Sequence, residues 1–85
     1  MYERDASPAP PPPPGAPVHA YTHYEVVAIN LTIEGGRYRA VAMAHHDQPD
    51  GRRAYQLCLW PALPDGRRTG WYWWNPDVMT RRDLR

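Results

Sequence analysis

The chain has 85 residues and a formal net charge of +1, and all ten of its Lys and Arg residues are arginine. This length allows a single domain, and the near-neutral charge does not resemble the basic surface of a protein that binds duplex nucleic acid. The sequence contains no apolar run long enough to span a bilayer and no recognisable signal peptide, so we expect a cytoplasmic protein with no membrane partner.

The N-terminal segment, residues 1–17, is dominated by proline. The run SPAPPPPPGAP, residues 7–17, holds seven of the eleven prolines in the chain. Proline fixes φ and lacks an N–H group, so this run favours polyproline II or open coil over sheet or helix. We expect residues 1–17 to form a disordered proline-rich tail and residues 18–85 to form one small β domain. The functional alternative for the tail is a ligand for an aromatic groove of the SH3 or WW kind.

Alternating apolar residues predict strands in the rest of the chain. Between residues 27 and 33 the apolar side chains are Val27, Ile29, Leu31 and Ile33, at the spacing of a half-buried strand. Further β-like runs cover residues 37–45, 54–60 and 70–74. Two glycines separate the first two runs and predict a hairpin turn. The expected fold class is all-β, a small antiparallel four-stranded meander.

The sequence PDGRR occurs twice, at residues 49–53 and 64–68. Proline suits the first central position of a turn, aspartate the second, and glycine the left-handed residue that closes it. We therefore interpret the repeat as one hairpin turn used twice rather than as a doubled anion-binding loop. In a meander the two copies lie at opposite ends of the sheet and cannot form one phosphate cradle.

A three-residue turn in each hairpin would set the register of the sheet. Leu31 would then face Arg39, and Met43 would face Leu57. This register places the larger apolar side chains on one face of the sheet. A register shifted by one residue would divide them between the two faces. That face comprises Val27, Ile29, Leu31, Ile33, Val41, Met43, Tyr55, Leu57, Leu59, Trp71 and Trp73. Since no long helix is predicted to cover it, we expect the sheet to curl as an SH3-like barrel, with a homodimer or a bound partner as the alternatives.

The last residues, NPDVMTRRDLR, begin like a helix. Asn75 is a suitable cap, Pro76 fits the first helical position, and Asp77 complements the positive end of the helix dipole. We expect a short C-terminal helix, which would need to pack against the sheet in order to be stable.

The opposite face of the predicted sheet suggests a binding surface. Ala40, Ala42 and Ala44 would form its floor, with large rings around them. Solvent-facing strand positions normally carry polar residues, so aromatic rings there are typical of an interface. The alternative is that the rings complete a second small core against the C-terminal helix and residues 18–21. The predicted function is a non-catalytic module that binds a partner protein, or a second copy of itself. The partner-binding candidates are Trp60, Tyr72, Trp74, Tyr24 and Tyr38.

Single-stranded nucleic acid is the second predicted ligand for the same rings. Bases stack on aromatic side chains while arginines contact phosphates. The candidate arginines are Arg37, Arg39, Arg67 and Arg68. Nine acidic residues and the small net charge argue against this alternative.

No pattern in the sequence predicts an enzyme, a cofactor or a metal site. There is no glycine-rich phosphate loop, and Ser7 is the only serine. His19 and His23 have a spacing that bridges a metal on a helix, but they lie in a β-like stretch. The single cysteine, Cys58, lies between two leucines and is expected to be a small buried residue.

The stretch CLWPALPDGRRTGW, residues 58–71, resembles the core of the MbtH-like proteins, accessory proteins of adenylation domains in nonribosomal peptide synthetases. The family's "SLWP" and following "GW" are matched by Leu59, Trp60, Pro61, Gly70 and Trp71, with Cys58 in place of the serine. YEVVAIN, residues 24–30, resembles the family's first strand. The spacing between the two parts is longer than in the family, and the family's helix is missing. The resemblance implies that Trp60 and Trp71 line a pocket that grips the partner enzyme.

Overall fold

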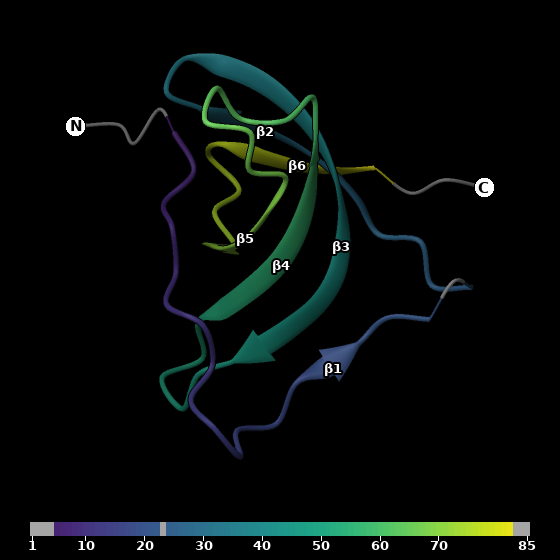
Figure 1. Cartoon of the computed structure of the whole chain (residues 1–85). Coiled ribbons are helices and arrows are strands. Elements are labelled where there is room, and N and C mark those ends of the chain that lie inside the picture. The colour runs from purple at the N-terminus through teal and green to yellow at the C-terminus, as the bar shows by residue number, and fades with distance from the viewer. Residues whose placement is uncertain (1–4, 23, 83–85) are drawn as a thin grey trace.

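The computed structural model describes residues 5–22 and 24–82, and it forms one antiparallel sheet of six strands (Figure 1). The strands are β1 His19–Ala20, β2 Ala28–Ile33, β3 Gly36–Asp47, β4 Arg53–Trp60, β5 Thr69–Trp73 and β6 Met79–Arg82. Their order across the sheet is β5-β4-β3-β2-β6, and β1 pairs with the far end of β3. The predicted all-β antiparallel class is confirmed.

The described part of the chain contains no helix that is long and apolar enough to cross a membrane.

The architecture is richer than the predicted four-stranded meander. The four predicted runs correspond to β2, β3, β4 and β5, which are neighbours in the sheet, but β1 and β6 extend it. Because β6 returns to pair with β2, the last strand lies beside the first long one. The path of paired strands is open, with β5 and β6 at its ends, so the SH3-like barrel is not confirmed.

The predicted C-terminal helix is wrong, because residues 75–82 form a single turn followed by β6. Asn75 does act as a cap: its side-chain oxygen accepts from the Asp77 amide at 2.9 Å, and its carbonyl accepts from Met79 at 2.9 Å. Met79 then pairs with Leu31, and both side chains are buried. A helix this short needs packing to be stable, and pairing with β2 buries the same apolar residues while satisfying the backbone.

The predicted register of β2 and β3 is wrong by one residue, and the cause is the turn between them. Ile33 pairs with Gly36, so the loop contains only Glu34 and Gly35, which have positive φ angles of 48° and 79°. Positive φ at both central residues is the geometry of a two-residue hairpin turn. Shortening the loop by one residue exchanges the two faces of β3.

A bulge at Met43 makes a second change of register, between β3 and β4. Ala42 pairs with Leu57, whereas Ala44 pairs with Gln56, so Met43 is the extra residue. The predicted pair of Met43 and Leu57 therefore does not form. A bulge increases strand twist and bend, in agreement with the strongly curved paths of β3 and β4 in Figure 1.

The core lies on the concave side of this curved sheet. Ile29, Leu57 and Leu59 are fully buried, and Ala40 and Ala42 of β3 point inward beside them. The alanines expected on the binding surface are therefore core residues, while Val41 and Met43, expected in the core, are exposed. This reversal follows directly from the shorter β2–β3 turn.

Residues 5–9 contact the sheet, whereas we expected residues 1–17 to be a disordered tail. Ala6 is buried in the core cluster, and its amide donates to the Thr32 carbonyl at 2.7 Å. The amide of Trp73 donates to the Ser7 carbonyl at 3.0 Å, and Ala9 donates to the Trp71 carbonyl at 2.9 Å. The segment thereby covers the outer edge of β5 and reaches the end of β2.

Both copies of PDGRR form the same turn, as predicted. The amides of Gly51 and Gly66 donate to the carbonyls of Gln48 and Leu63 at 2.9 Å and 2.8 Å, and both glycines have φ near +90°. The preceding aspartate accepts from the amide two residues later in each copy, at 3.0 Å. The two turns lie at opposite ends of β4 in Figure 1, so they do not form one anion site.

Candidate functional site

The candidate site is the convex side of the sheet, which we call the outer face. It is defined by the strand residues whose side chains point away from the core, as the pairing and burial patterns place them. These are Ala28, Asn30, Thr32, Arg37, Arg39, Val41, Met43, Gln56, Cys58, Trp60, Thr69, Trp71, Trp73, Thr80 and Arg82. None of them is an acidic residue, and three are tryptophan.

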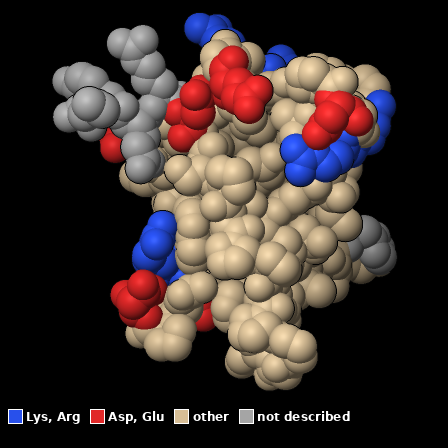
Figure 2. Space-filling model, turned by 60° about the vertical axis from the view of Figure 1, so that its left-hand side comes forward, with Lys and Arg blue, Asp and Glu red and all other residues tan. Residues whose placement is uncertain are grey.

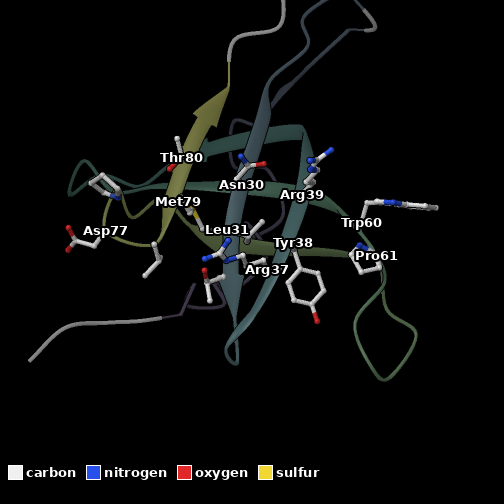
Figure 3. Close-up of a pocket in the computed structure, with 13 residues that line it drawn as sticks. Asn30, Leu31, Arg37, Tyr38, Arg39, Trp60, Pro61, Asp77, Met79 and Thr80 are labelled. Carbon is white, nitrogen blue, oxygen red and sulfur yellow. The ribbon is translucent and has the colours of Figure 1, made fainter.

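Cross-strand pairing arranges part of the outer face in a straight row. Thr80 pairs with Asn30, Asn30 with Arg39, and Arg39 with Trp60, so the row crosses β6, β2, β3 and β4. Side chains directly opposite each other in an antiparallel pair are about 5 Å apart and interact. Figure 3 shows Asn30, Arg39 and Trp60 projecting from three neighbouring strands.

Two hollows border this row and share Asn30, Arg39 and Trp60. The larger, of about 730 Å³, extends towards Tyr38 and Asp77 (Figure 3). The smaller, of about 270 Å³, runs across the outer face, and we call it the Trp60 groove. It is lined by Ala28, Asn30, Arg39, Ala40, Val41, Cys58, Trp60 and Arg82. The groove therefore combines an aliphatic floor with an aromatic ring and two guanidinium groups.

Large apolar side chains are unusually exposed around the Trp60 groove. Trp60 and Val41, which line the groove, are 65% and 48% exposed, and Met43, two residues after Val41 in β3, is 43% exposed. Cys58, which we expected to be buried, is also exposed, because it lies between the two inward-facing leucines of β4. Single exposed apolar residues need no explanation, but a contiguous group on one sheet face marks an interaction surface.

Arginines surround this apolar surface without neutralising partners. The guanidinium of Arg68 lies over the Trp60 ring at 4.9 Å, and that of Arg52 lies over Trp73 at 3.8 Å. The ion pairs within the described residues join Arg53 to Asp47, Arg67 to Asp65 and His19 to Glu25. None of these pairs includes Arg37, Arg39 or Arg82, so the outer face presents a positive charge.

The five predicted partner-binding residues do not share one surface. Trp60 and Tyr24 are exposed, the latter on the loop before β2. Tyr38 and Trp74 are partly buried and pack against the core. Tyr72 is 6% exposed, and burial raises the pKa of its hydroxyl. The one-residue change in register explains why Tyr38 faces inward rather than outward.

Sequence reasoning missed Trp71, Trp73, Val41 and Met43 as members of the outer face. For Val41 and Met43, the signal that could have found them is the Glu34-Gly35 pair. A two-residue turn at this pair, in place of a three-residue turn, exchanges the inward and outward side chains of β3. For β5, the pairing of Gln56 with Trp71 is set by the long loop after Trp60, which carries no comparable signal.

The four predicted nucleic-acid-binding arginines separate into different environments. Arg37 and Arg39 are exposed on the outer face. Arg68 lies over Trp60, whereas Arg67 is paired with Asp65 in its own turn at 2.6 Å. The hydrogen bond from the Arg67 amide, and next the pairing with the Arg67 guanidinium, hold the pKa of the Asp65 carboxyl below its usual range. Of the four arginines, Arg39, which pairs with Trp60, and Arg68 therefore lie beside this ring.

A second cluster of polar rings lies on the inner side, where β1 meets β3. His19 stacks on His45 with ring centroids 4.9 Å apart, and Nδ1 of His45 shares a hydrogen bond with the Tyr21 hydroxyl. Burial lowers the pKa of His45 and raises that of Tyr21. The described residues contain no group of three His, Cys, Asp or Glu side chains that could hold a metal ion. His23 of the predicted pair lies outside the described residues.

Comparisons with protein-family models, with curated proteins and with solved structures found no match to this chain. The resemblance of residues 58–71 to the MbtH-like proteins is therefore carried by the quoted motifs alone. Trp60 and Trp71, which that resemblance groups together, both lie on the outer face, although Trp71 pairs with Gln56 rather than with Trp60.

Proposed function

We propose that this protein is a non-catalytic binding module that takes up a partner protein on its outer face, centred on Trp60. The observation that carries the proposal is the exposed apolar group of Trp60, Val41 and Met43 beside arginines that take part in none of the ion pairs among the described residues. Protein interfaces are enriched in Trp, Met and Arg, and their strongest contacts are made by central aromatic anchors.

The charge of the outer face indicates the kind of partner surface. Arg39 and Arg82 line the Trp60 groove, and Arg37 lies beside it. Complementary potentials speed association and fix orientation. A partner that offers an apolar side chain to Trp60 and carboxylates to the arginines fits this groove.

Single-stranded nucleic acid is the second candidate, and the stacking of Arg52 and Arg68 on tryptophan rings favours it. Two features favour protein instead. Each of these two rings already has a guanidinium over one side. The floor of the Trp60 groove carries the aliphatic side chains of Ala28, Ala40 and Val41, which offer no polar contact to phosphates or bases. An MbtH-like accessory role is a special case of protein binding, with Trp60 and Trp71 as the gripping residues.

A capture experiment with matched variants tests the proposal. The full chain, Trp60→Ala and Tyr24→Ala are each used as bait in a lysate of the source cells. Tyr24 is 86% exposed but lies off the sheet, so it controls for the loss of an exposed ring. We expect one protein to be retained by the full chain and by Tyr24→Ala, and to be lost with Trp60→Ala.

The salt dependence of binding and the mass of the chain in solution then distinguish the possible ligands. Retention of the partner from about 0.05 M to 0.2 M salt supports apolar protein contacts, whereas a steep loss, together with binding of an oligonucleotide, supports nucleic acid. Light scattering on the purified chain identifies a second copy as the partner if a dimer forms and Trp60→Ala abolishes it. Identical capture by all three baits would contradict the proposal, and co-purification with an adenylation enzyme would single out the MbtH-like alternative.

A further inference from the structure

The proline-rich segment has a burial pattern with a period of three residues. Ala6 is buried, and Ala9 and Pro12 are partly buried, while Pro10, Pro11, Pro13 and Pro14 are exposed. A polyproline II helix has three residues per turn. One edge of this segment, at positions 6, 9 and 12, therefore lies against the protein, and between positions 8 and 14 the two other edges point to solvent.

The segment is fixed at both ends, so we call residues 6–17 the proline strap. At its start, the backbone of Ser7 and Ala9 hydrogen-bonds with Trp73 and Trp71 on β5. Near its end the strap turns, with Ala16 donating to the Pro13 carbonyl at 3.0 Å. Nδ1 of His46 lies 3.0 Å from the Pro17 carbonyl, which can only accept, so the histidine donates this hydrogen bond. The five successive prolines from position 10 are thus held between two anchors.

The strap is also free of charge. No charged residue occurs between Ala6 and Val18. Figure 2 turns forward the side of the molecule along which the strap runs in Figure 1, and its charged side chains gather at the upper rim and at one lower corner. The broad uncharged surface between them lacks the groups that would recruit an ionic partner.

We propose that the proline strap is a preformed polyproline ligand for a partner domain whose groove is lined by parallel aromatic rings. Such grooves take up the ridges of a polyproline II helix between flat rings. The strap offers the ridge of Pro10 and Pro13 and the ridge of Pro11 and Pro14, both exposed. Because its ends are anchored, most of the ordering entropy is lost on folding rather than on binding, which favours affinity.

This surface is separate from the Trp60 groove. The hydrogen bonds of the strap to the rest of the protein are with the end of β2, the edge of β5 and His46, whereas the groove is formed by β2, β3, β4 and β6. The proposal therefore does not depend on the function proposed for the outer face.

Isothermal titration of the full chain with three purified probes tests the proposal: an SH3 domain, a WW domain and an EVH1 domain. We expect at least one to bind, and the double variants Pro10→Ala/Pro13→Ala and Pro11→Ala/Pro14→Ala to weaken that binding about tenfold, equivalent to roughly 1.4 kcal/mol. Pro12→Ala, on the inward edge, is the matched control and should change binding little. Trp60→Ala should bind the probe normally.

A synthetic peptide of residues 7–17 measures the contribution of the anchors. The full chain should bind the probe more tightly than the peptide. Equal affinities would contradict the proposal that the anchors hold the strap in its binding conformation. Absence of binding by all three probes at up to about 1 mM, a range in which binding of about −4 kcal/mol is detectable, would overturn the ligand proposal. Equal losses in the exposed-edge variants and in Pro12→Ala would also overturn it, since they would indicate a purely structural strap.

Discussion

The two faces of β3 show how a curved sheet can reverse the usual distribution of apolar residues. On the concave side the strand contributes Ala40 and Ala42, which are 4% and 2% exposed. On the convex side it contributes Val41 and Met43, which are nearly half exposed. The concave side of a strongly curved sheet has less room, so small residues fit where the leucines of β4 already fill the space. Side-chain size therefore does not identify the buried face here.

Inward and outward side chains are also expected to differ in what they contribute, the former to stability and the latter to binding. Inward side chains are packed by neighbours from several strands, so changing them alters the free energy of unfolding. Outward side chains around Trp60 have few neighbours, so changing them should alter binding far more than folding. Substitutions at adjacent positions of one strand can test this separation without changing the region of the fold.

The largest effect is expected from truncation of the best buried side chain. Leu57→Ala should lower the free energy of unfolding by about 2–5 kcal/mol, because it removes a fully buried leucine and leaves a cavity. Cys58→Ala, at the next position but on the outer face, should stay within about 0.5 kcal/mol. Urea denaturation of both variants measures the difference, and similar losses would contradict the assignment of faces in β4.

Enlarging a residue of β3 tests the reversed register directly. Ala42→Leu should destabilise the fold by about 1–3 kcal/mol, because the concave core has no room for a larger side chain. Val41→Leu, pointing to solvent, should change stability by less than about 0.5 kcal/mol. The register with a three-residue turn requires the opposite order, so urea denaturation of this pair decides between the two arrangements.

A smaller effect is expected at the centre of the outer face. Trp60→Ala should reduce stability by only about 0.5–1 kcal/mol, since the cation–π contact with Arg68 is the interaction lost from an exposed ring. Arg68→Ala should cost a similar amount. A double-mutant cycle in thermal unfolding should show that the two losses do not add, and a large loss for Trp60→Ala alone would make this ring part of the core.

The smallest effect concerns pH at the inner cluster of rings. Burial, and next the charge of Arg53, lower the pKa of His45 below its ordinary value of 6.5. The unfolded chain therefore binds a proton more readily than the folded one, so stability present above about pH 6.5 should decline as the pH falls through that value towards the folded pKa. Thermal unfolding from about pH 8 to pH 5.5 should show a modest fall in Tm.

His45→Asn should flatten this part of the pH profile. His19→Asn, at an exposed position, should retain it. The carboxyl of Asp47 has its pKa lowered by the hydrogen bond from Arg53, so its contribution is lost only as the pH falls below about 3.8 and does not interfere. A profile unchanged in His45→Asn would place the pH response elsewhere.

Local sequence signals predicted the parts of this fold that depend on neighbouring residues. The alternation in β2 and β4 correctly identified Ile29, Leu57 and Leu59 as buried. The Asn75 cap formed where it was predicted, but the chain that follows it did not continue as a helix. A cap fixes one turn, whereas the choice between helix and strand for residues 79–82 depended on a free edge of β2 far away in sequence.

The candidate site was predictable only at its centre. Trp60 follows two inward-facing leucines at alternating positions, so its outward direction could be read from β4 alone. Tyr38 and Tyr72 were misplaced because their faces depend on the length of a turn and on the pairing of another strand. The outer-face arginines could be listed as candidates from the sequence. Their surroundings could not be predicted, because their neighbours come from three different strands.

The sequence by itself determined the all-β class, the hairpin between β2 and β3, the repeated PDGRR turn and the inward positions of β4, since these depend on backbone preferences and period-two alternation within short stretches. Only the tertiary structure decided that alanines line the core, that the proline strap lies along the edge of β5, and that Trp60, Val41 and Arg39 meet on one surface. A one-residue change in loop length or one bulge reverses a whole strand, and long-range packing selects between such alternatives.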